Sequence, residues 1–164
     1  MIVAIIQARM ESTRLPGKVL MDLNGIPMLQ YQVDRVEKSK LIEQVFVATS
    51  KLPQDDEIEI FCKKNNIAFF RGSEDDVLSR YYDAAKKYEV NTIVRITADC
   101  PLIDPAVIDR TIELFQKNNL DYASNTAPQE NSQYPDGSDV EVFSMSALER
   151  ANQEATSKED REHV

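Results

Sequence analysis

Hydrophobic positions in the first part of the chain change from a short apolar run to a helical spacing. Residues 2–6 are almost wholly apolar, as a strand covered on both faces of a sheet must be. Pro27 can open a helix, and apolar residues then recur at spacings of three and four up to Val36. The pattern predicts a strand, a connection without periodicity over residues 7–26, and a helix. A connection of that length is more often functional than decorative.

The same alternation continues along the rest of the chain. It predicts helices over residues 55–65, 74–88 and 105–118, and strands over residues 44–49, 67–70, 92–96, 122–124 and 140–143. Repeated strand–helix–strand units imply a mainly parallel sheet with helices on both faces. Because ligands of such sheets bind beyond the carboxyl ends of the strands, we expect the chemistry in the loops after Gln7, Thr97 and Ser124. The polar segment 125–137 is expected to be an exposed loop.

Length and composition narrow the class of protein. The chain has 164 residues, enough for one domain with a substantial core, and its 19 basic and 28 acidic residues give a net charge of −9. Such a chain repels phosphate backbones, so we expect no nucleic acid partner. No apolar run approaches the roughly 18 residues of a membrane span, and the start is unlike a signal peptide, so we expect no membrane partner and a cytoplasmic location. Cys62 and Cys100 indicate ordinary thiols of a reducing compartment.

The loop after the first strand departs from the acidic average. Residues 1–20 contain three cations, Arg9, Arg14 and Lys18, and a single acid, Glu11. Arginine offers a planar fork to phosphate oxygens and lysine a mobile point charge, while Ser12 and Thr13 add hydroxyls and backbone N–H groups. The loop therefore suits a compact polyanion such as a triphosphate, although three solvated surface cations explain the pattern equally well. The glycines required by a P-loop or a Rossmann fingerprint are missing.

A second candidate site follows the predicted strand 92–96. Asp99 stands just beyond that strand, where α/β nucleotide enzymes hold a divalent metal, and Mg²⁺ is commonly bound by one or two carboxylates plus substrate phosphates. Taken alone, the residues slightly favour the alternative that Asp99 only caps a turn before Pro101. Cys100 is a poor nucleophile candidate, and a histidine metal site is excluded, because His163 is the single histidine and lies at the far end.

Three segments of the chain resemble a known family. Residues 5–29, IIQARMESTRLPGKVLMDLNGIPML, are similar to the opening of the cytidylyltransferases that activate 3-deoxy-manno-octulosonate and acylneuraminates. The loop of that family, A-R-x-x-S-T-R-L-P-G-K, is matched by residues 8–18. FRGSEDDVL at 70–78 and TADCPLI at 97–103 resemble its spore coat polysaccharide biosynthesis branch. The resemblance implies the nucleotide-diphospho-sugar transferase fold, a Rossmann-like three-layer α/β/α sandwich.

The resemblance also implies roles for individual residues. Arg9, Arg14 and Lys18 would contact the CTP phosphates, with Lys18 nearest the reacting α-phosphate. The wider set expected to bind the nucleotide is Ala8, Arg9, Met10, Ser12, Arg14, Lys18, Arg71, Asp76 and Thr97. Within that set, the backbone around Ala8 and Met10 would lie against cytosine, and Arg71 and Asp76 would line the base and ribose pocket. Catalysis would rest on Arg9, Arg14, Lys18 and Asp99, with Asp99 as the Mg²⁺ ligand. Asp139 and Glu141 are expected on the acceptor side.

The implied reaction joins CTP and an acidic sugar to give a CMP-sugar and pyrophosphate, in surface or spore coat polysaccharide biosynthesis. A homodimer is left open. Members of the family continue past the position of Val164 and carry a second metal-binding aspartate there, so we expect residues 1–164 to form one domain truncated at its C-terminus, with incomplete catalytic competence. Two alternatives remain: a glycosyltransferase of the same fold that uses a nucleotide-sugar, and a catalytically weak nucleotide-binding partner subunit.

Overall fold

A six-stranded sheet, in the order β5-β4-β1-β6-β8-β7, forms the middle layer of the molecule. The structure is a computed structural model that describes residues 1–12, 14–126, 132–162 and 164. Its parallel strands are β1 (Ile2–Gln7), β4 (Gln44–Ser50), β5 (Ala68–Gly72) and β6 (Thr92–Thr97). At one edge, β8 (Glu141–Ser144) runs antiparallel to β6, and β7 (Tyr122–Ser124) runs antiparallel to β8. The predicted mainly parallel sheet is confirmed.

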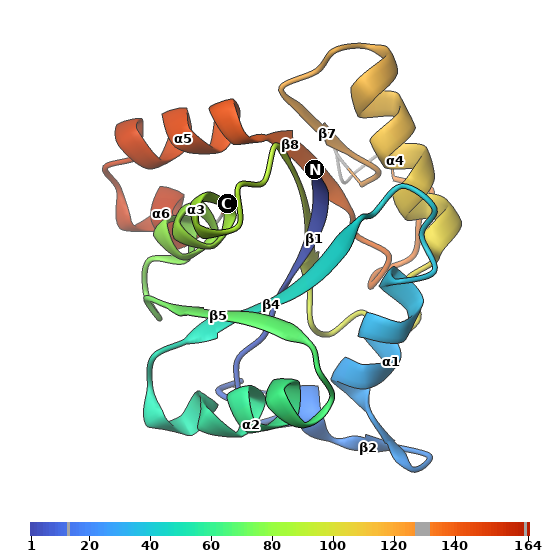
Figure 1. The fold of residues 1–164 in the computed structure, drawn as a ribbon, viewed down its shortest axis with the longest axis vertical. Helices are drawn as coiled ribbons and strands as arrows, with labels where there is room; N and C mark the ends of the chain where they lie inside the picture. Colours follow the sequence, from blue (N-terminus) through green and yellow to red (C-terminus); the bar gives the residue numbers. More distant parts are fainter. Residues whose placement is uncertain (13, 127–131, 163) are drawn as a thin grey trace.

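Helices cover both faces of this sheet. One face packs against α1 (Met28–Val36), α2 (Asp56–Lys64) and α4 (Pro105–Lys117). The other packs against α3 (Val77–Lys87) and α5 (Met145–Glu154), with the short α6 (Lys158–Glu162) beside α3. Figure 1 shows α3, α5 and α6 to the left of the sheet and α1 and α4 to its right. The expected three-layer α/β/α sandwich is therefore confirmed.

The apolar residues of β1 place this strand in the middle of the sheet, where both of its faces are covered by helices. Val3 and Ile5 point to the side of α3 and α5, whereas Ala4 and Ile6 point to the side of α1, α2 and α4, and all four have no exposed surface. Burying each isoleucine contributes roughly 1.5–3 kcal/mol relative to leaving it in water. Parallel neighbours on both sides, β4 and β6, hold β1 in register. The carboxyl end of β1 is thus a rigid base for the loop that follows.

Some elements differ from the sequence-based expectation. Residues 7–26 are not irregular throughout, because they contain a 3-10 turn at Lys18–Leu20 and a small hairpin, β2 (Asp22–Leu23) and β3 (Ile26–Pro27). Its turn, Asn24-Gly25, has positive φ at both residues, which Asn-Gly adopts readily. Helix α3 begins at Val77 rather than at residue 74, because the Asp76 carboxylate accepts from the Ser79 N–H and caps the helix. Helices α5 and α6 were not predicted.

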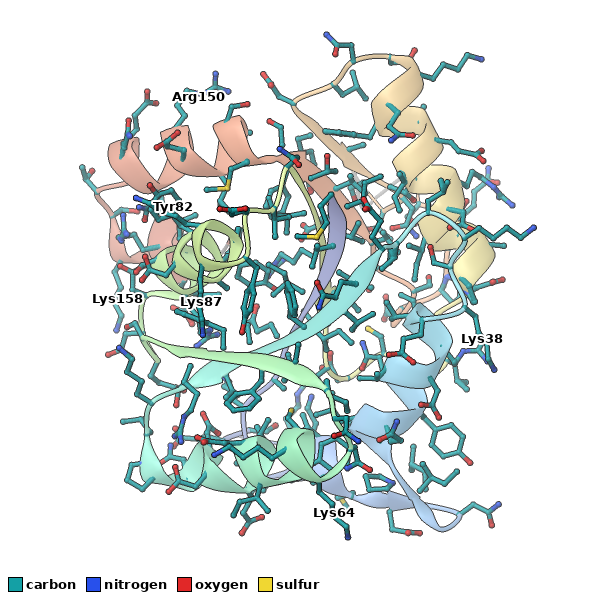
Figure 2. All side chains as sticks on the ribbon, in the orientation of Figure 1. Lys38, Lys64, Tyr82, Lys87, Arg150 and Lys158 are labelled. Atoms are coloured by element: carbon teal, nitrogen blue, oxygen red, sulfur yellow. The ribbon has the colours of Figure 1, made fainter. Side chains whose placement is uncertain are left out.

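Several lysines lie on the surface of the molecule. Figure 2 labels Lys38, Lys64 and Lys158 near the outline of the molecule and Lys87 between α3 and β5, and all four are exposed. Among the residues described, no helix is long and apolar enough to cross a membrane. Cys62 and Cys100 are free thiols buried in the interior, as expected of ordinary structural cysteines.

Candidate active site

A cavity of about 280 Å³ lies beyond the carboxyl ends of β1 and β6, where the sheet topology predicted a site. Its walls come from the loop after β1 and the turn after β6. The residues that line it are Gln7, Arg9, Glu11, Ser12, Arg14, Lys18, Val19, Thr97, Ala98 and Asp99. The structure thus brings the three cations of the loop together with Ser12, Thr97 and Asp99, residues that the sequence places up to 90 positions apart. Thr13 lies outside the described residues.

The loop closes on itself through its glycine. Gly17 has a φ of +72°, a left-handed conformation that costs other residues energy, and its N–H donates to the Met10 carbonyl at 2.7 Å. The Leu15 N–H donates to the Ser12 hydroxyl at 3.4 Å, which tightens the bend between them. Immediately after Gly17, the 3-10 turn begins at Lys18. Closure of the loop therefore brings Lys18 back towards the strand end from which Arg9 departs.

A buried carboxylate anchors this loop to the neighbouring strand. Asp55 has no exposed surface, and its Oδ1 accepts from the Met10 N–H at 2.7 Å. Its Oδ2 accepts from the Ser50 hydroxyl at 2.5 Å and from the Ser50 N–H at 3.2 Å. Sequence reasoning missed this role, since Asp55 was expected only as the first residue of a helix. An aspartate just past a strand end is the one indication that the sequence offers.

The backbone expected to lie against the base, around Ala8 and Met10, has both of these N–H groups bonded within the fold. The Ala8 N–H donates to the Ala48 carbonyl at 3.0 Å, and the Met10 N–H is held by Asp55. Base contacts along this stretch would therefore fall to carbonyl oxygens, of which that of Met10 already accepts from the Gly17 N–H. The exocyclic amine of cytosine is a donor, so it suits such acceptors.

Lys18 and Asp99 meet inside the cavity. The Lys18 Nζ lies 2.7 Å from Asp99 Oδ2, and the Thr97 hydroxyl donates to Asp99 Oδ1 at 2.8 Å. Partial burial alone would raise the pKa of Asp99. The hydrogen bonds from Lys18 and Thr97 outweigh burial, so the pKa is lowered from its ordinary value of 3.8. Asp99 is therefore a carboxylate at neutral pH, and its side chain keeps 43% of its surface exposed for a ligand.

Arg9 has a carboxylate partner of its own, Glu74. Its Nη1 lies 3.5 Å from Glu74 Oε1, while half of the Arg9 side chain remains exposed. Glu74 itself is only 15% exposed, and its Oε2 is buried without a hydrogen-bond partner among the described residues. The buried Glu74 thus holds one face of the Arg9 guanidinium and leaves the other face towards solvent and the cavity.

Arg71 and Asp76 are engaged elsewhere in the fold. Arg71 Nη1 pairs with Asp56 and Glu59 at 2.7 and 2.6 Å, and its other nitrogens donate to carbonyls of the β4–α2 connection. Asp76 caps α3 and pairs with Arg161 of α6 at 2.7 Å. Neither residue lines the cavity that holds Lys18 and Asp99. Their expected contacts with base and ribose are untested. In this structure Arg71 joins β5 to α2, and Asp76 joins α3 to α6.

A second, smaller cavity adjoins the first at Thr97, which lines both. It measures about 180 Å³ and is lined by Arg95, Thr97, Thr126, Asp139 and Glu141. Asp139 and Glu141, the residues expected on the acceptor side, therefore lie next to the cavity of the loop over residues 8–18, the expected phosphate loop. The Arg95 side chain was not anticipated at this position. Residues 127–131 of the expected loop lie outside the described residues, as does His163.

Comparison with known proteins decides the family. The family model described as cytidylyltransferase matches residues 3–164. This chain belongs to the cytidylyltransferase family. It is 39% identical over 125 residues to the spore coat polysaccharide biosynthesis protein SpsF of Bacillus subtilis, covering 74% of this chain and 52% of that protein. It is 36% identical over 118 residues to 3-deoxy-manno-octulosonate cytidylyltransferase of Trichlorobacter lovleyi, covering 71% and 46% respectively. The chain thus spans about half the length of these two curated relatives.

A solved member of the cytidylyltransferase family has the same fold. The cytidylyltransferase of Leptospira borgpetersenii superposes with a TM-score of 0.91 at 38% identity, over 99% of this chain and 68% of that one. The close agreement extends to β7, β8 and α5, which follow the residues with the most recognisable motifs. This confirms the nucleotidyltransferase architecture expected from the sequence.

The cavity of this cytidylyltransferase domain has a donor set that fits Mg²⁺. In the described part of the chain, no group of three or more His, Cys, Asp or Glu residues forms a ready metal cage. Magnesium does not need one, since it is usually bound by one or two carboxylates, substrate phosphates and water. Asp99 offers a half-exposed, ionised carboxylate beside the cations that suit phosphate, and Glu11 lines the same cavity. Asp99 is therefore the residue that would hold the ion.

Proposed function

We propose that the protein containing this domain transfers the cytidylyl group of CTP to a hydroxyl of an acidic sugar, giving a CMP-sugar and pyrophosphate. One observation carries the proposal: a single cavity gathers Arg9, Arg14 and Lys18 of the family loop around the ionised Asp99. The membership of the chain in the cytidylyltransferase family supports CTP as the nucleotide. A relative named 3-deoxy-manno-octulosonate cytidylyltransferase supports an acidic sugar as the acceptor.

The residues of the cavity divide the work of an in-line displacement. An oxygen–phosphorus bond forms between the sugar hydroxyl and the α-phosphorus, while the bond from that phosphorus to the oxygen bridging it to the β-phosphorus breaks. The hydroxyl proton is released to solvent, and the bridging oxygen leaves with the pyrophosphate. Arg9 and Arg14 bind the β- and γ-phosphates and stabilise the charge of the leaving pyrophosphate. Lys18 moves from Asp99 to the α-phosphate, where its ammonium balances the charge of the transition state. Mg²⁺, held by Asp99, would supply further charge neutralisation when bound. Such reactions depend mainly on positioning and electrostatics.

The pathway proposed for the product is surface or spore coat polysaccharide biosynthesis. Its support is the similarity to a protein named for spore coat polysaccharide biosynthesis in Bacillus subtilis. A glycosyltransferase of the same fold is less favoured, because such enzymes usually carry an Asp-x-Asp metal motif and here Pro101 stands two places after Asp99.

Nucleotide-dependent stability tests the proposal on this chain. We expect CTP with Mg²⁺ to raise the melting temperature more than ATP, GTP or UTP does at the same concentration. A ligand at about 100 times its dissociation constant adds roughly 2.7 kcal/mol of stability. Equal shifts with all four triphosphates would refute the cytidine assignment and leave a general phosphate loop.

A second measurement separates the enzyme classes. Pyrophosphate release from CTP is followed with 3-deoxy-manno-octulosonate and N-acetylneuraminate as acceptors, with Lys18→Met as the inactive control. Release that depends on the sugar and on Lys18 supports the transferase. Stronger stabilisation by a CMP-sugar than by CTP, with sugar transfer and no pyrophosphate, would identify the glycosyltransferase instead.

A further inference from the structure

The smaller cavity, next to the phosphate loop, is lined by a cationic side chain, Arg95, that has no role in the proposed reaction. Arg95 lies on β6, two residues before Thr97, and both side chains point to the same face of the sheet because strand residues alternate. Thr97 lines both cavities, so a ligand that fills the smaller one has one end close to the phosphate loop and Asp99. Arg95 is the one cation among the described residues that line the smaller cavity.

The Arg95 guanidinium is held by one carboxylate and keeps unused donors. It faces Glu141 across the antiparallel register of β6 and β8, and its Nη1 donates to Glu141 Oε2. Its Nε is buried without a hydrogen-bond partner among the described residues, so a ligand does not reach it, whereas Nη2 makes no hydrogen bond to a described residue. The terminal nitrogens are therefore the donors open to a ligand. A guanidinium presents five N–H donors and binds a carboxylate best through two of them at once. Arg95 therefore has the capacity to bind a second carboxylate.

The two tyrosines near Arg95, Tyr81 and Tyr122, stay protonated and therefore bring no negative charge to it. Burial raises the pKa of Tyr81 to about 12, and the Tyr81 hydroxyl donates to the Ile5 carbonyl at 3.3 Å. Burial and the proximity of Glu141 also raise the pKa of Tyr122 to about 12, so its hydroxyl stays protonated and donates to Glu141 Oε1 at 3.0 Å. Glu141 thus has a donor on each oxygen, from Arg95 and from Tyr122, and can keep the second if it loses the first.

The charges of the cavity make Glu141 a competitor for any anionic ligand. Arg95 contributes one positive charge, whereas Asp139 and Glu141 contribute two negative charges. A carboxylate that enters must therefore take Arg95 from Glu141 or share it. An uncharged sugar has no group that can do so and leaves the Arg95–Glu141 pair closed.

We propose that Arg95 is the residue that selects the acceptor by its carboxylate, and that Glu141 keeps the guanidinium in place and competes for it. The inference rests on the proposed function, which supplies the acidic sugar. In this arrangement the acceptor carboxylate binds Arg95 and the acceptor hydroxyl lies towards Thr97, at the junction with the cavity of Lys18 and Asp99. Arg95 acts on specificity and takes no part in the chemistry at phosphorus.

The test compares a sugar acid with the same sugar lacking the charge. Binding of N-acetylneuraminate and of 3-deoxy-manno-octulosonate is measured by calorimetry in the presence of a non-hydrolysable CTP analogue. Their primary amides, which preserve the ring and hydroxyls, are measured in parallel. The expected wild-type result is at least a tenfold preference for one of the acids over its amide. No binding of either acid, or equal binding of acid and amide, overturns the proposal.

Two variants with opposite expected signs sharpen the test. Arg95→Met should remove the preference, so that acid and amide bind equally. Glu141→Gln preserves the shape of the competitor without its charge, and it should bind the acid about three- to tenfold more tightly while leaving the amide unchanged. If Arg95→Met fails to fold, the sign of the Glu141→Gln effect still decides. Weaker acid binding by Glu141→Gln, a preference retained by Arg95→Met, or tighter binding of an amino sugar would each overturn the assignment.

Affinity for CTP keeps this inference apart from the proposed function. Both variants should bind CTP within twofold of the wild type, because neither side chain lines the cavity of the phosphate loop. If wild-type protein fails to bind CTP, the proposed function fails. If it binds CTP and shows no dependence of acid binding on Arg95, only the present inference fails.

Discussion

Replacing Asp55 by asparagine tests whether a buried carboxylate positions the phosphate loop. The substitution preserves size and shape but removes the charge and converts one acceptor into a donor. In the wild type the two oxygens together accept three hydrogen bonds, from the Met10 N–H, the Ser50 N–H and the Ser50 hydroxyl. The amide nitrogen of asparagine cannot accept, so it faces at least one N–H that it cannot satisfy.

The size of the effect follows from these contacts. If the amide oxygen remains at Met10, the Ser50 N–H loses its partner inside the protein, at a cost of about 1–3 kcal/mol. The bond to Met10 changes from a charged to a neutral acceptor and weakens by about 1 kcal/mol. The sum is about 2–4 kcal/mol of unfolding free energy, or a melting temperature lower by about 5–15 °C for a domain of this size. The weaker anchor at Met10 should reduce CTP affinity by about fivefold.

The assay separates stability from positioning. Urea unfolding gives the free energy, and CTP affinity is measured by calorimetry at 10 °C, where the variant remains folded. Asp34→Asn is the matched control, because Asp34 is exposed on α1 and, within the described part of the chain, accepts only from the Gln30 side chain four residues earlier. The control should stay within about 0.5 kcal/mol of the wild type. A folded Asp55→Asn protein with wild-type CTP affinity would show that the anchor supports the fold and not the loop.

Two further substitutions test other parts of the argument. Lys18→Met should lower stability by no more than about 1 kcal/mol, because the ion pair that it removes is partly exposed. It should lower turnover with CTP about a hundredfold and raise the pKa of Asp99 in a carboxyl NMR titration. Because the pKa of Asp99 is lowered in the folded protein, its contact with Lys18 stabilises the fold fully at pH values above the ordinary pKa of 3.8. This stabilisation is lost as the pH falls through the pKa of Asp99 in the folded protein. An Asp99 pKa that is unchanged in the variant would contradict this argument. Gly72→Ala would place its Cβ 2.7 Å from Cγ of the buried Arg80, so urea unfolding should show a loss of about 1–3 kcal/mol, and wild-type stability would refute the close contact.

The sequence predicts those features whose physical cause is local. The apolar run of β1 requires a strand buried on both faces, and the cations of residues 8–18 require either a ligand or solvent. The topology rule then brings the loops after Gln7 and Thr97 to one end of the sheet, which places Lys18 beside Asp99. The direction of these strands, not any motif, is what makes an 81-residue separation a direct contact.

Other features depend on pairs of residues that no local pattern connects. Asp55 meets Met10 across 45 positions, and Arg95 meets Glu141 across 46. In the sequence each of these four residues has an ordinary local explanation, as a helix start, a loop residue or a polar position on a strand. Arg71 and Asp76 lie in a segment that resembles a family motif and therefore suggested a role at the site. Their side chains instead bind Glu59 and Arg161 within the fold. A motif identifies the segment, and tertiary contacts decide what each side chain binds.

The pairing of cations with carboxylates explains how so acidic a chain can present a site for a polyanion. Lys18 lies on Asp99, Arg9 lies near Glu74, and the loop backbone is fixed by Asp55. These carboxylates hold the cations in position before any ligand is present, so little side-chain freedom is lost on binding. A triphosphate carries more charge than a single carboxylate and can displace Asp99 from Lys18. In the proposed reaction, that displacement would free the Asp99 oxygen that faces Lys18, so nucleotide binding would also make this carboxylate available to a cation.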